Sequence, residues 1–187
     1  RWLNDKGENE FTYTFGENEN KVYFAHSMLY HPDRFLRFAS AKSLDVEEFC
    51  KSQKGRSLPC VKFGSGERSI VLTSRHHACE STGNYVLEGL LEELIEHPIE
   101  NTKILCVPFV DYDGVVDGDQ GKNRAPWDHN RDYDYNVPSI YEVSQKIKEY
   151  VAINGCHYAF DFHAPWHWGE QNDKVFIVHK SFEQVDR

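Results

Sequence analysis

Two short apolar runs that flank an amphipathic segment constrain the fold of this chain more than any other feature. Ser69–Thr73 (SIVLT) and Lys103–Val107 (KILCV) have the length and composition of buried strands. Between them, Tyr85–His97 carries apolar side chains at helical spacing: Val86, Leu87, Leu90, Leu91, Leu94 and Ile95. A strand, a helix of this length and a second strand form a right-handed crossover between parallel neighbours in one sheet.

Further segments extend this pattern into an α/β fold class. Pro59–Phe63, Cys156–Phe162 and Lys174–Val178 are expected strands, and Pro32–Ala39 and Ser139–Ile153 are expected helices.

Two segments depart from the pattern. Aromatic residues alternate with threonine before a turn-rich stretch, which predicts a hairpin over residues 11–25. Residues 109–137 show no period, and loops that long in compact domains are usually functional or disordered. A solvated acidic loop remains an alternative for this second segment.

Composition restricts the partners of the chain. Its 187 residues suffice for one folded domain, and the formal charge of −9 disfavours nonspecific binding to nucleic acid. The longest apolar stretch, Ile104–Val110, is far shorter than the ~20 residues that span a bilayer, so no membrane partner is expected. Five cysteines without CxxC spacing favour reduced thiols in a cytoplasm.

The histidines point to metal chemistry. The pattern His-x-x-Glu places an imidazole and a carboxylate on one side of a turn, where both can bind one Zn²⁺. It is unspecific by itself in a chain with ten histidines, and it occurs three times, at His77/Glu80, His97/Glu100 and His167/Glu170. Position in the fold must therefore select among these pairs.

The carboxyl edge of the predicted sheet selects the first pair. His77 and Glu80 follow the Ser69–Thr73 strand, and open α/β sheets bind ligands at that edge. His163 follows another predicted strand and is expected at the same edge, which completes a three-ligand site with an open position. His97 and Glu100 fall at the opposite edge and are expected on the surface.

Neighbouring polar residues have two interpretations each. Asp161 either orients a metal ligand or is a buried aspartate bonded to backbone amides. His76 projects in another direction than His77 if the segment is extended, and is not favoured as a ligand. His167 and Glu170 either line the site or are ordinary loop residues.

Four motifs occur in a specific order: GRSLPCVKFGSGERSIVLTSRHHACEST (55–82), VPFVDYDGV (107–115), GKNRAPWDHNRDY (121–133) and DFH (161–163). In this order the chain resembles the zinc metallocarboxypeptidases, and most of all the cytosolic carboxypeptidase branch. The resemblance implies a mixed, mostly parallel sheet with helices on both faces. It also implies that residues 1–20 are the tail or last strand of a preceding small β-domain, and that residues 21–187 form the catalytic domain, apparently incomplete at its C-terminus.

The resemblance implies a function residue by residue. The enzyme would remove C-terminal residues from peptides or protein tails in the cytoplasm, with water bound to a single Zn²⁺ as the nucleophile. Arg124 matches the arginine that polarises the scissile carbonyl. A planar guanidinium also binds a carboxylate through two parallel hydrogen bonds, which would let the enzyme recognise a chain end. The remaining matches are the substrate-carboxylate pair Asn130 and Arg131 and the zinc ligands His77, Glu80 and His163.

The sequence also departs from the family pattern. Ala78-Cys79 replaces Pro-Gly, Asp111-Tyr112 replaces Asn-Pro, and His129 replaces Leu. The general-base glutamate of the family lies well beyond the third ligand, and neither Glu170 nor Glu183 has a spacing that recommends it. That motif is therefore expected to be missing from this chain, and these 187 residues by themselves are expected to be a weak catalyst or none.

The missing motif leaves two interpretations of the chain, and two further functions also remain open. The chain is expected to be a piece of a longer carboxypeptidase, which the start at Arg1 also favours, or else a shortened relative. A deacylase of N-acyl amino acids would share the same zinc ligation. A noncatalytic module that binds zinc and peptide C-termini is the other possible function. The sequence predicts neither the side-chain specificity nor the oligomeric state.

Overall fold

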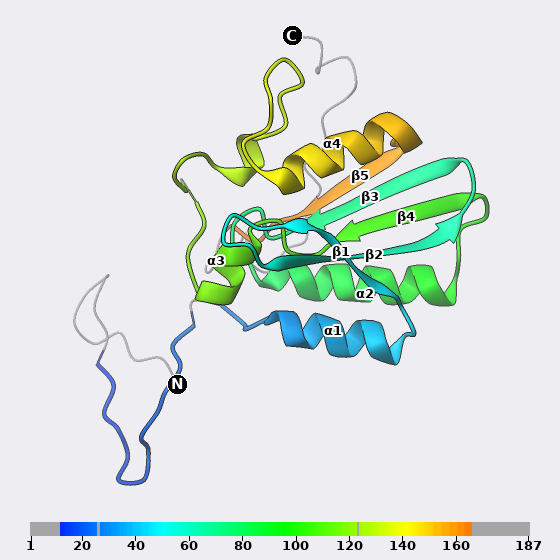
Figure 1. Ribbon diagram of the computed structural model, residues 1–187. Coiled ribbons are helices and arrows are strands. Elements are labelled where there is room, and N and C mark those ends of the chain that lie inside the picture. The colour runs from blue at the N-terminus through cyan, green and yellow to red at the C-terminus, as the bar shows by residue number, and fades with distance from the viewer. Residues whose placement is uncertain (1–11, 26, 123, 166–187) are drawn as a thin grey trace.

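A five-stranded sheet forms the centre of the computed structural model, which describes residues 12–25, 27–122 and 124–165. The strand order is β1-β2-β4-β3-β5 (Figure 1). The five strands are β1 (Val46–Lys51), β2 (Ser57–Ser65), β3 (Arg68–Ser74), β4 (Thr102–Val107) and β5 (Tyr158–Phe162). β4, β3 and β5 are parallel, whereas β1 and β2 are antiparallel to their neighbours. The predicted mixed sheet is therefore confirmed.

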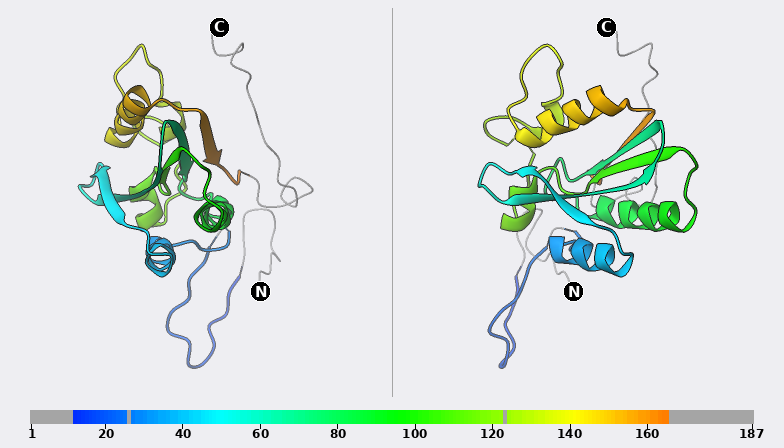
Figure 2. Two further views of the ribbon diagram at one scale, coloured as in Figure 1. Left: turned by 90° about the vertical axis from the view of Figure 1, so that its right-hand side faces the viewer. Right: turned by 45° about the vertical axis from the view of Figure 1, so that its right-hand side comes forward.

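Helices cover both faces of this sheet, as the views in Figure 2 show. The helices are α1 (Pro32–Ala41), α2 (Thr82–Glu96), α3 (Tyr112–Asp117) and α4 (Glu142–Asn154). Helices α1 and α2 pack on one face, where Phe35, Leu87 and Leu91 are buried. Helix α4 packs on the other face through Val143 and Ile147. This two-faced burial explains why β3 and β4 read as continuous apolar runs.

The predicted β3-α2-β4 crossover is present. Ile70 in β3 is paired with Ile104 in β4 in parallel register, and Ser74 at the end of β3 is paired with Phe162 at the end of β5. The carboxyl ends of β3, β4 and β5 therefore lie at one edge of the sheet. Residues that directly follow these strands are brought together there.

Several local predictions need correction. The described residues 12–25 form a turn closed by the Glu19 amide and the Gly16 carbonyl, but no strand, so the hairpin is wrong in that part. Strand β1 was not predicted, because its sequence VEEFCK lacks a regular alternation. Residues 109–137 contain α3 and a short 3₁₀ helix, η1 (His129–Arg131), and are not one irregular loop. The Lys174–Val178 strand lies outside the described residues.

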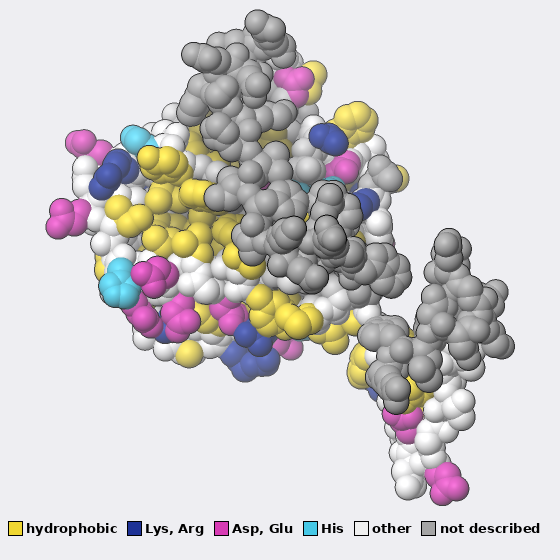
Figure 3. All heavy atoms as spheres, turned by 180° about the vertical axis from the view of Figure 1, so that it is seen from behind, with side chains coloured by type: hydrophobic (Ala, Val, Ile, Leu, Met, Phe, Trp, Pro, Cys, Tyr) yellow, Lys and Arg dark blue, Asp and Glu magenta, His cyan; other side chains and the backbone are white. Residues whose placement is uncertain are grey.

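The edge of the described sheet carries apolar side chains at the surface. Tyr158 and Phe160 in β5 are exposed, and with Ile70, Leu90 and Leu94 they line a groove beside α2. Figure 3 shows hydrophobic side chains gathered on the face that is turned away in Figure 1. None of the described helices has the length and apolar character needed to cross a membrane.

Candidate metal centre

Three side chains, His77, Glu80 and His163, meet at the carboxyl edge of the sheet although 83 positions separate the last two. Nδ1 of His77 lies 2.9 Å from Oε1 of Glu80, and Nδ1 of His163 lies 2.7 Å from Oε2 of Glu80. One ligand atom from each residue lies within 4.8 Å of those of the other two. Two imidazole nitrogens and one carboxylate oxygen fit a zinc ion with a fourth position open.

The loop that carries His77 and Glu80 is anchored from inside by Arg75. This residue adopts a left-handed backbone with φ of 61° and is only 6% exposed. Its guanidinium donates to the carbonyl of Ala78 inside the loop and to Oδ1 of Asn84 in the first turn of α2. Because a buried guanidinium needs these acceptors, the loop and the helix are tied to one cation.

Close packing brings His163 to the loop that carries His77 and Glu80. A Cβ added at Gly83 would lie 3.0 Å from the carbonyl oxygen of Phe162, so the start of α2 rests directly on the end of β5. The Ala164 amide, one residue after His163, donates to Oε2 of Glu80 over 3.0 Å. The backbone after β5 is thereby fixed against the Glu80 carboxylate.

The carboxylate of Glu80 is buried among donors. Burial by itself would raise its pKa, but hydrogen bonds from His163, His77 and Lys122 outweigh burial and hold the pKa well below its usual range. The hydrogen bond to Glu80 raises the pKa of His77. Burial lowers the pKa of His163, but hydrogen bonds to Asp161 and Glu80 raise it to about 10. The cluster thus holds an ionised carboxylate between two basic imidazoles.

Carboxylates also contact the far nitrogens of both imidazoles. Nε2 of His163 lies 2.6 Å from Oδ2 of Asp161, and Nε2 of His77 lies 3.2 Å from Oδ2 of Asp128. Histidine metal ligands usually donate their second N–H to such a group, which fixes the tautomer and raises basicity. Among the described residues, Asp161 bonds to side chains and to no backbone amide, so the geometry favours its interpretation as an orienting residue.

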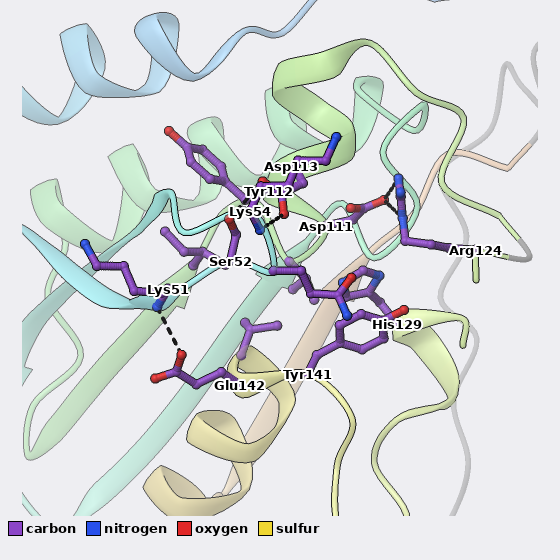
Figure 4. Close-up of a pocket in the computed structure, with 14 residues that line it drawn as sticks. Lys51, Ser52, Lys54, Asp111, Tyr112, Asp113, Arg124, His129, Tyr141 and Glu142 are labelled. Carbon is purple, nitrogen blue, oxygen red and sulfur yellow. Dashed lines mark hydrogen bonds and ion pairs between the residues drawn. The ribbon is translucent and has the colours of Figure 1, made fainter. Parts of the chain in front are cut away.

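Arg124 lies beside the loop that carries His77 and Glu80, but its guanidinium contacts the carboxylates of Asp111 and Asp119. Its Nη2 lies 2.6 Å from Oδ2 of Asp111 and 2.8 Å from Oδ2 of Asp119, and Figure 4 shows the guanidinium turned toward Asp111. The second oxygen of Asp111 accepts the Gly114 amide and caps α3. No contact joins Arg124 to the three clustered residues among the described atoms. Its match to the carbonyl-polarising arginine therefore stays a prediction.

The substrate-binding pair predicted from the resemblance lies on η1. Asn130 and Arg131 follow Asp128, whose carboxylate accepts the Asn130 amide and caps the helix. Arg131 is exposed, which leaves its guanidinium open to solvent. Since Asp128 also contacts His77, η1 is held against the cluster of His77, Glu80 and His163.

A small pocket on the other side of Arg124 contains His129, which stands where the family usually has Leu. Its ring stacks on Tyr141 with centroids 3.7 Å apart, and both rings are visible in Figure 4. Burial lowers the pKa of His129 to about 4, so the imidazole is neutral at pH 7. Its Nδ1 has no hydrogen-bond partner among the described residues.

Sequence reasoning missed two contacts of the cluster. The Lys122 ammonium lies 3.0 Å from Oε1 of Glu80, and the buried His76 ring contacts Asp161. Neither residue belongs to a metal-ligand pattern, so only the fold could reveal them. The expectation that His97 and Glu100 lie on the surface is confirmed, whereas His167/Glu170 lies outside the described residues.

Gly121 and Gly118 provide a matched test of the packing beneath the cluster. Both have positive φ, but a Cβ at Gly121 would lie 2.3 Å from the Ala78 amide nitrogen, and one at Gly118 would meet nothing within 4 Å. We expect Gly118→Ala to cost about 1–2 kcal/mol of stability for the left-handed backbone. Gly121→Ala should cost a further ~1–3 kcal/mol from overpacking. Urea unfolding measures both, and equal losses would contradict the close approach.

Comparison with known proteins shows similarity to cytosolic carboxypeptidases. No protein-family model matches the chain. An uncharacterised protein of Zymomonas mobilis is 25% identical, over 85% of this chain and 45% of the relative. Cytosolic carboxypeptidase 2 of Xenopus tropicalis is 23% identical, over 82% and 19%. Human cytosolic carboxypeptidase 6 is 22% identical, over 95% and 40%. The chain thus spans less than half the length of these relatives.

Solved structures share the fold. A metallo-carboxypeptidase from Burkholderia cenocepacia has a TM-score of 0.63 at 21% identity, covering 74% of this chain and 42% of that one. Carboxypeptidase A from Helicoverpa armigera has a TM-score of 0.60 at 14% identity, covering 79% and 49%. At these identities the likeness establishes the fold. The predicted resemblance to the zinc metallocarboxypeptidases, on the side of their cytosolic branch, is therefore confirmed in sequence and in fold.

Proposed function

We propose that this chain provides the metal centre of a zinc-dependent metallocarboxypeptidase that hydrolyses C-terminal residues from peptides or protein tails. The observation that carries the proposal is the convergence of His77, Glu80 and His163 at the carboxyl edge of the sheet. Likeness to proteins named cytosolic carboxypeptidases supports both the reaction and a cytoplasmic location.

Each residue has a defined task in this proposal. His77, Glu80 and His163 would hold a single ion through Nδ1, one carboxylate and Nδ1, while Asp128 and Asp161 orient the two rings. Bound zinc with an open position lowers the pKa of a coordinated water to about 7 and polarises a carbonyl.

Two cationic residues would recognise the substrate. Arg131 is exposed on η1 beside the cluster, and with Asn130 it would bind the C-terminal carboxylate of a peptide through parallel N–H donors. Arg124 would stabilise charge on the scissile carbonyl oxygen, for which its guanidinium must leave Asp119 or share it. The general base stays unassigned, because neither Glu170 nor Glu183 has the spacing of the family's glutamate, and both lie outside the described residues.

Metal removal tests the centre directly. Chelator-treated protein should bind one zinc ion per chain, and zinc at about a thousand times its dissociation constant should raise the free energy of unfolding by about 4 kcal/mol. Mg²⁺ should not replace it, because Mg²⁺ prefers an octahedron of oxygen ligands. Metal analysis and thermal unfolding measure both effects. Failure to bind zinc, or equal stabilisation by Mg²⁺, would contradict the proposal.

The reaction is tested by substrates that differ at one group. In a longer form of the chain that carries the general base, release of the last residue is expected from a peptide with a free C-terminus and not from the same peptide amidated, because the amide lacks the negative charge that would pair with Arg131. Hydrolysis of N-acyl amino acids in place of peptides would identify the deacylase alternative. Peptide binding in the presence of zinc without release of a product, even by a longer form of the chain that extends beyond Arg187, would identify the noncatalytic module and exclude hydrolysis.

A further inference from the structure

His76 precedes the first proposed metal ligand, yet its ring lies in a separate buried network. It is only 3% exposed, with Nδ1 2.8 Å from Oδ1 of Asp161 and Nε2 2.7 Å from the hydroxyl of Tyr133. An ionised carboxylate can only accept hydrogen bonds, so Nδ1 of His76 must donate to Asp161. In a neutral ring Nε2 then accepts, and the Tyr133 hydroxyl donates to it. Asp161 thereby selects the tautomer of His76, and the Tyr133 hydroxyl hydrogen-bonds the remaining ring nitrogen.

The carboxylate of Asp161 connects His76 to His163. Oδ1 accepts from His76 and, over 2.9 Å, from the Thr73 hydroxyl, whereas Oδ2 faces Nε2 of His163 at 2.6 Å. A carboxylate with both oxygens engaged in this way has a fixed plane. The Nε2–H of His163 is then directed at Oδ2, which leaves Nδ1 of His163 facing Glu80 and the ligand cluster.

We propose that His76 is a positioning residue for the metal centre: it holds Asp161 so that His163 presents Nδ1 to the ion. The inference rests on the metal site proposed above and adds a residue outside the three-ligand set. Groups that orient a metal-bound imidazole commonly change metal affinity 10–100-fold when they are removed. His76 acts one hydrogen bond further out, and its burial makes that hydrogen bond persistent.

A second ion is the competing interpretation of the same atoms. His76, Asp161 and His163 also present ligand atoms within 4.8 Å of one another. Such an ion would need Nε2 of His163 as a ligand while Nδ1 serves the first ion, so the ring would lose both protons. It would also break the donations from His76 and His163 to Asp161. The hydrogen-bonded relay requires neither change.

Two substitutions at His76 separate the effect of its hydrogen-bond donor from the effect of its size. His76→Phe keeps an aromatic ring but removes the donor to Asp161, whereas the amide of His76→Asn can replace the Nδ1 donor. We expect His76→Phe to weaken zinc binding about tenfold and His76→Asn to stay within about threefold of the unchanged protein. Tyr133→Phe, which loses only the hydroxyl, should give an intermediate loss. His97→Phe, at an exposed histidine, serves as the control and should change nothing.

The readouts are zinc affinity by chelator competition, metal content, and the visible absorption bands of the Co²⁺-loaded protein, which report ligand geometry. The Co²⁺ bands should shift in His76→Phe and recover in His76→Asn. Unchanged affinity and bands in His76→Phe would overturn the inference, as would two ions per chain with one lost in that variant. If His76→Phe does not fold, equal affinities for Tyr133→Phe and the unchanged protein overturn it. Absence of zinc binding by the unchanged protein would refute the proposed function and this inference together.

Discussion

Glu80→Gln should abolish tight zinc binding while the metal-free protein keeps its fold. The side chain is 1% exposed and accepts from four directions: His77, His163, Lys122 and the Ala164 amide. A glutamine of the same size removes the one negative charge that faces the ion. The loss in affinity should exceed the 10–100-fold typical of residues that only orient a ligand. Chelator competition measures it, with circular dichroism to verify folding.

Glu100→Gln is the matched control for this substitution. Glu100 belongs to another His-x-x-Glu pair, but it is exposed beyond the end of α2, far along the helix from the cluster. Zinc affinity should be unchanged in this variant. If both substitutions weakened binding equally, or if Glu80→Gln bound zinc like the unchanged protein, Glu80 would not be a ligand. Glu80→Asp is a less informative substitution than Glu80→Gln, since the shorter aspartate side chain also changes the geometry of the cluster.

The principal elements around the site could be predicted because their signals are local. The apolar runs of β3 and β4 and the helical spacing in α2 fix a parallel crossover, and that crossover fixes the edge where His77 and Glu80 must lie. His163 followed from the same rule applied to β5. The three-residue cluster was thus accessible from strand ends and chemistry together.

The other features of the site depend on contacts between distant segments. Strand β1 forms because its backbone pairs with β2. Its sequence VEEFCK has no periodicity that predicts a strand. Helix α3 is only six residues long and starts at the Asp111 cap within an acidic stretch, so it resembled a loop. The approach of Lys122 to Glu80 depends on the path of residues 118–122, which composition does not specify. Such features are tertiary in origin.

The ion pairs of Arg124 with Asp111 and Asp119 differ from the contacts that its motif match predicts. The sequence places this arginine at the position of a family role, but the Asp111 and Asp119 carboxylates accept its guanidinium in the structure. An arginine held by two carboxylates is oriented in advance, which would reduce the entropy lost if it bound the proposed substrate. The same carboxylates would compete with that substrate for the N–H donors of Arg124.

Zinc should reverse the pH dependence of stability, and His163 is the reason. Its pKa is raised to about 10 in the metal-free fold, above an unfolded value near 6.5. The folded state therefore keeps a proton that the unfolded state releases, and this contribution is complete below pH 6.5 and is lost as pH rises toward 10. Zinc requires the deprotonated ring, so its affinity should instead rise about tenfold per pH unit for each proton displaced.

Thermal unfolding at pH 6.5, 7.5 and 8.5 tests this opposition. With chelator, the melting temperature should fall as pH rises, and with buffered free zinc it should rise over the same interval. Replacing the titrating ring in His163→Gln should flatten both trends, since other ionisable groups are shared by the two proteins. The hydrogen bonds of His163 with Asp161 and Glu80 make the effect large, because both neighbours are carboxylates that stabilise the imidazolium and outweigh the cost of its burial. Parallel trends with and without zinc would mean that the ion does not bind at the His163 nitrogen.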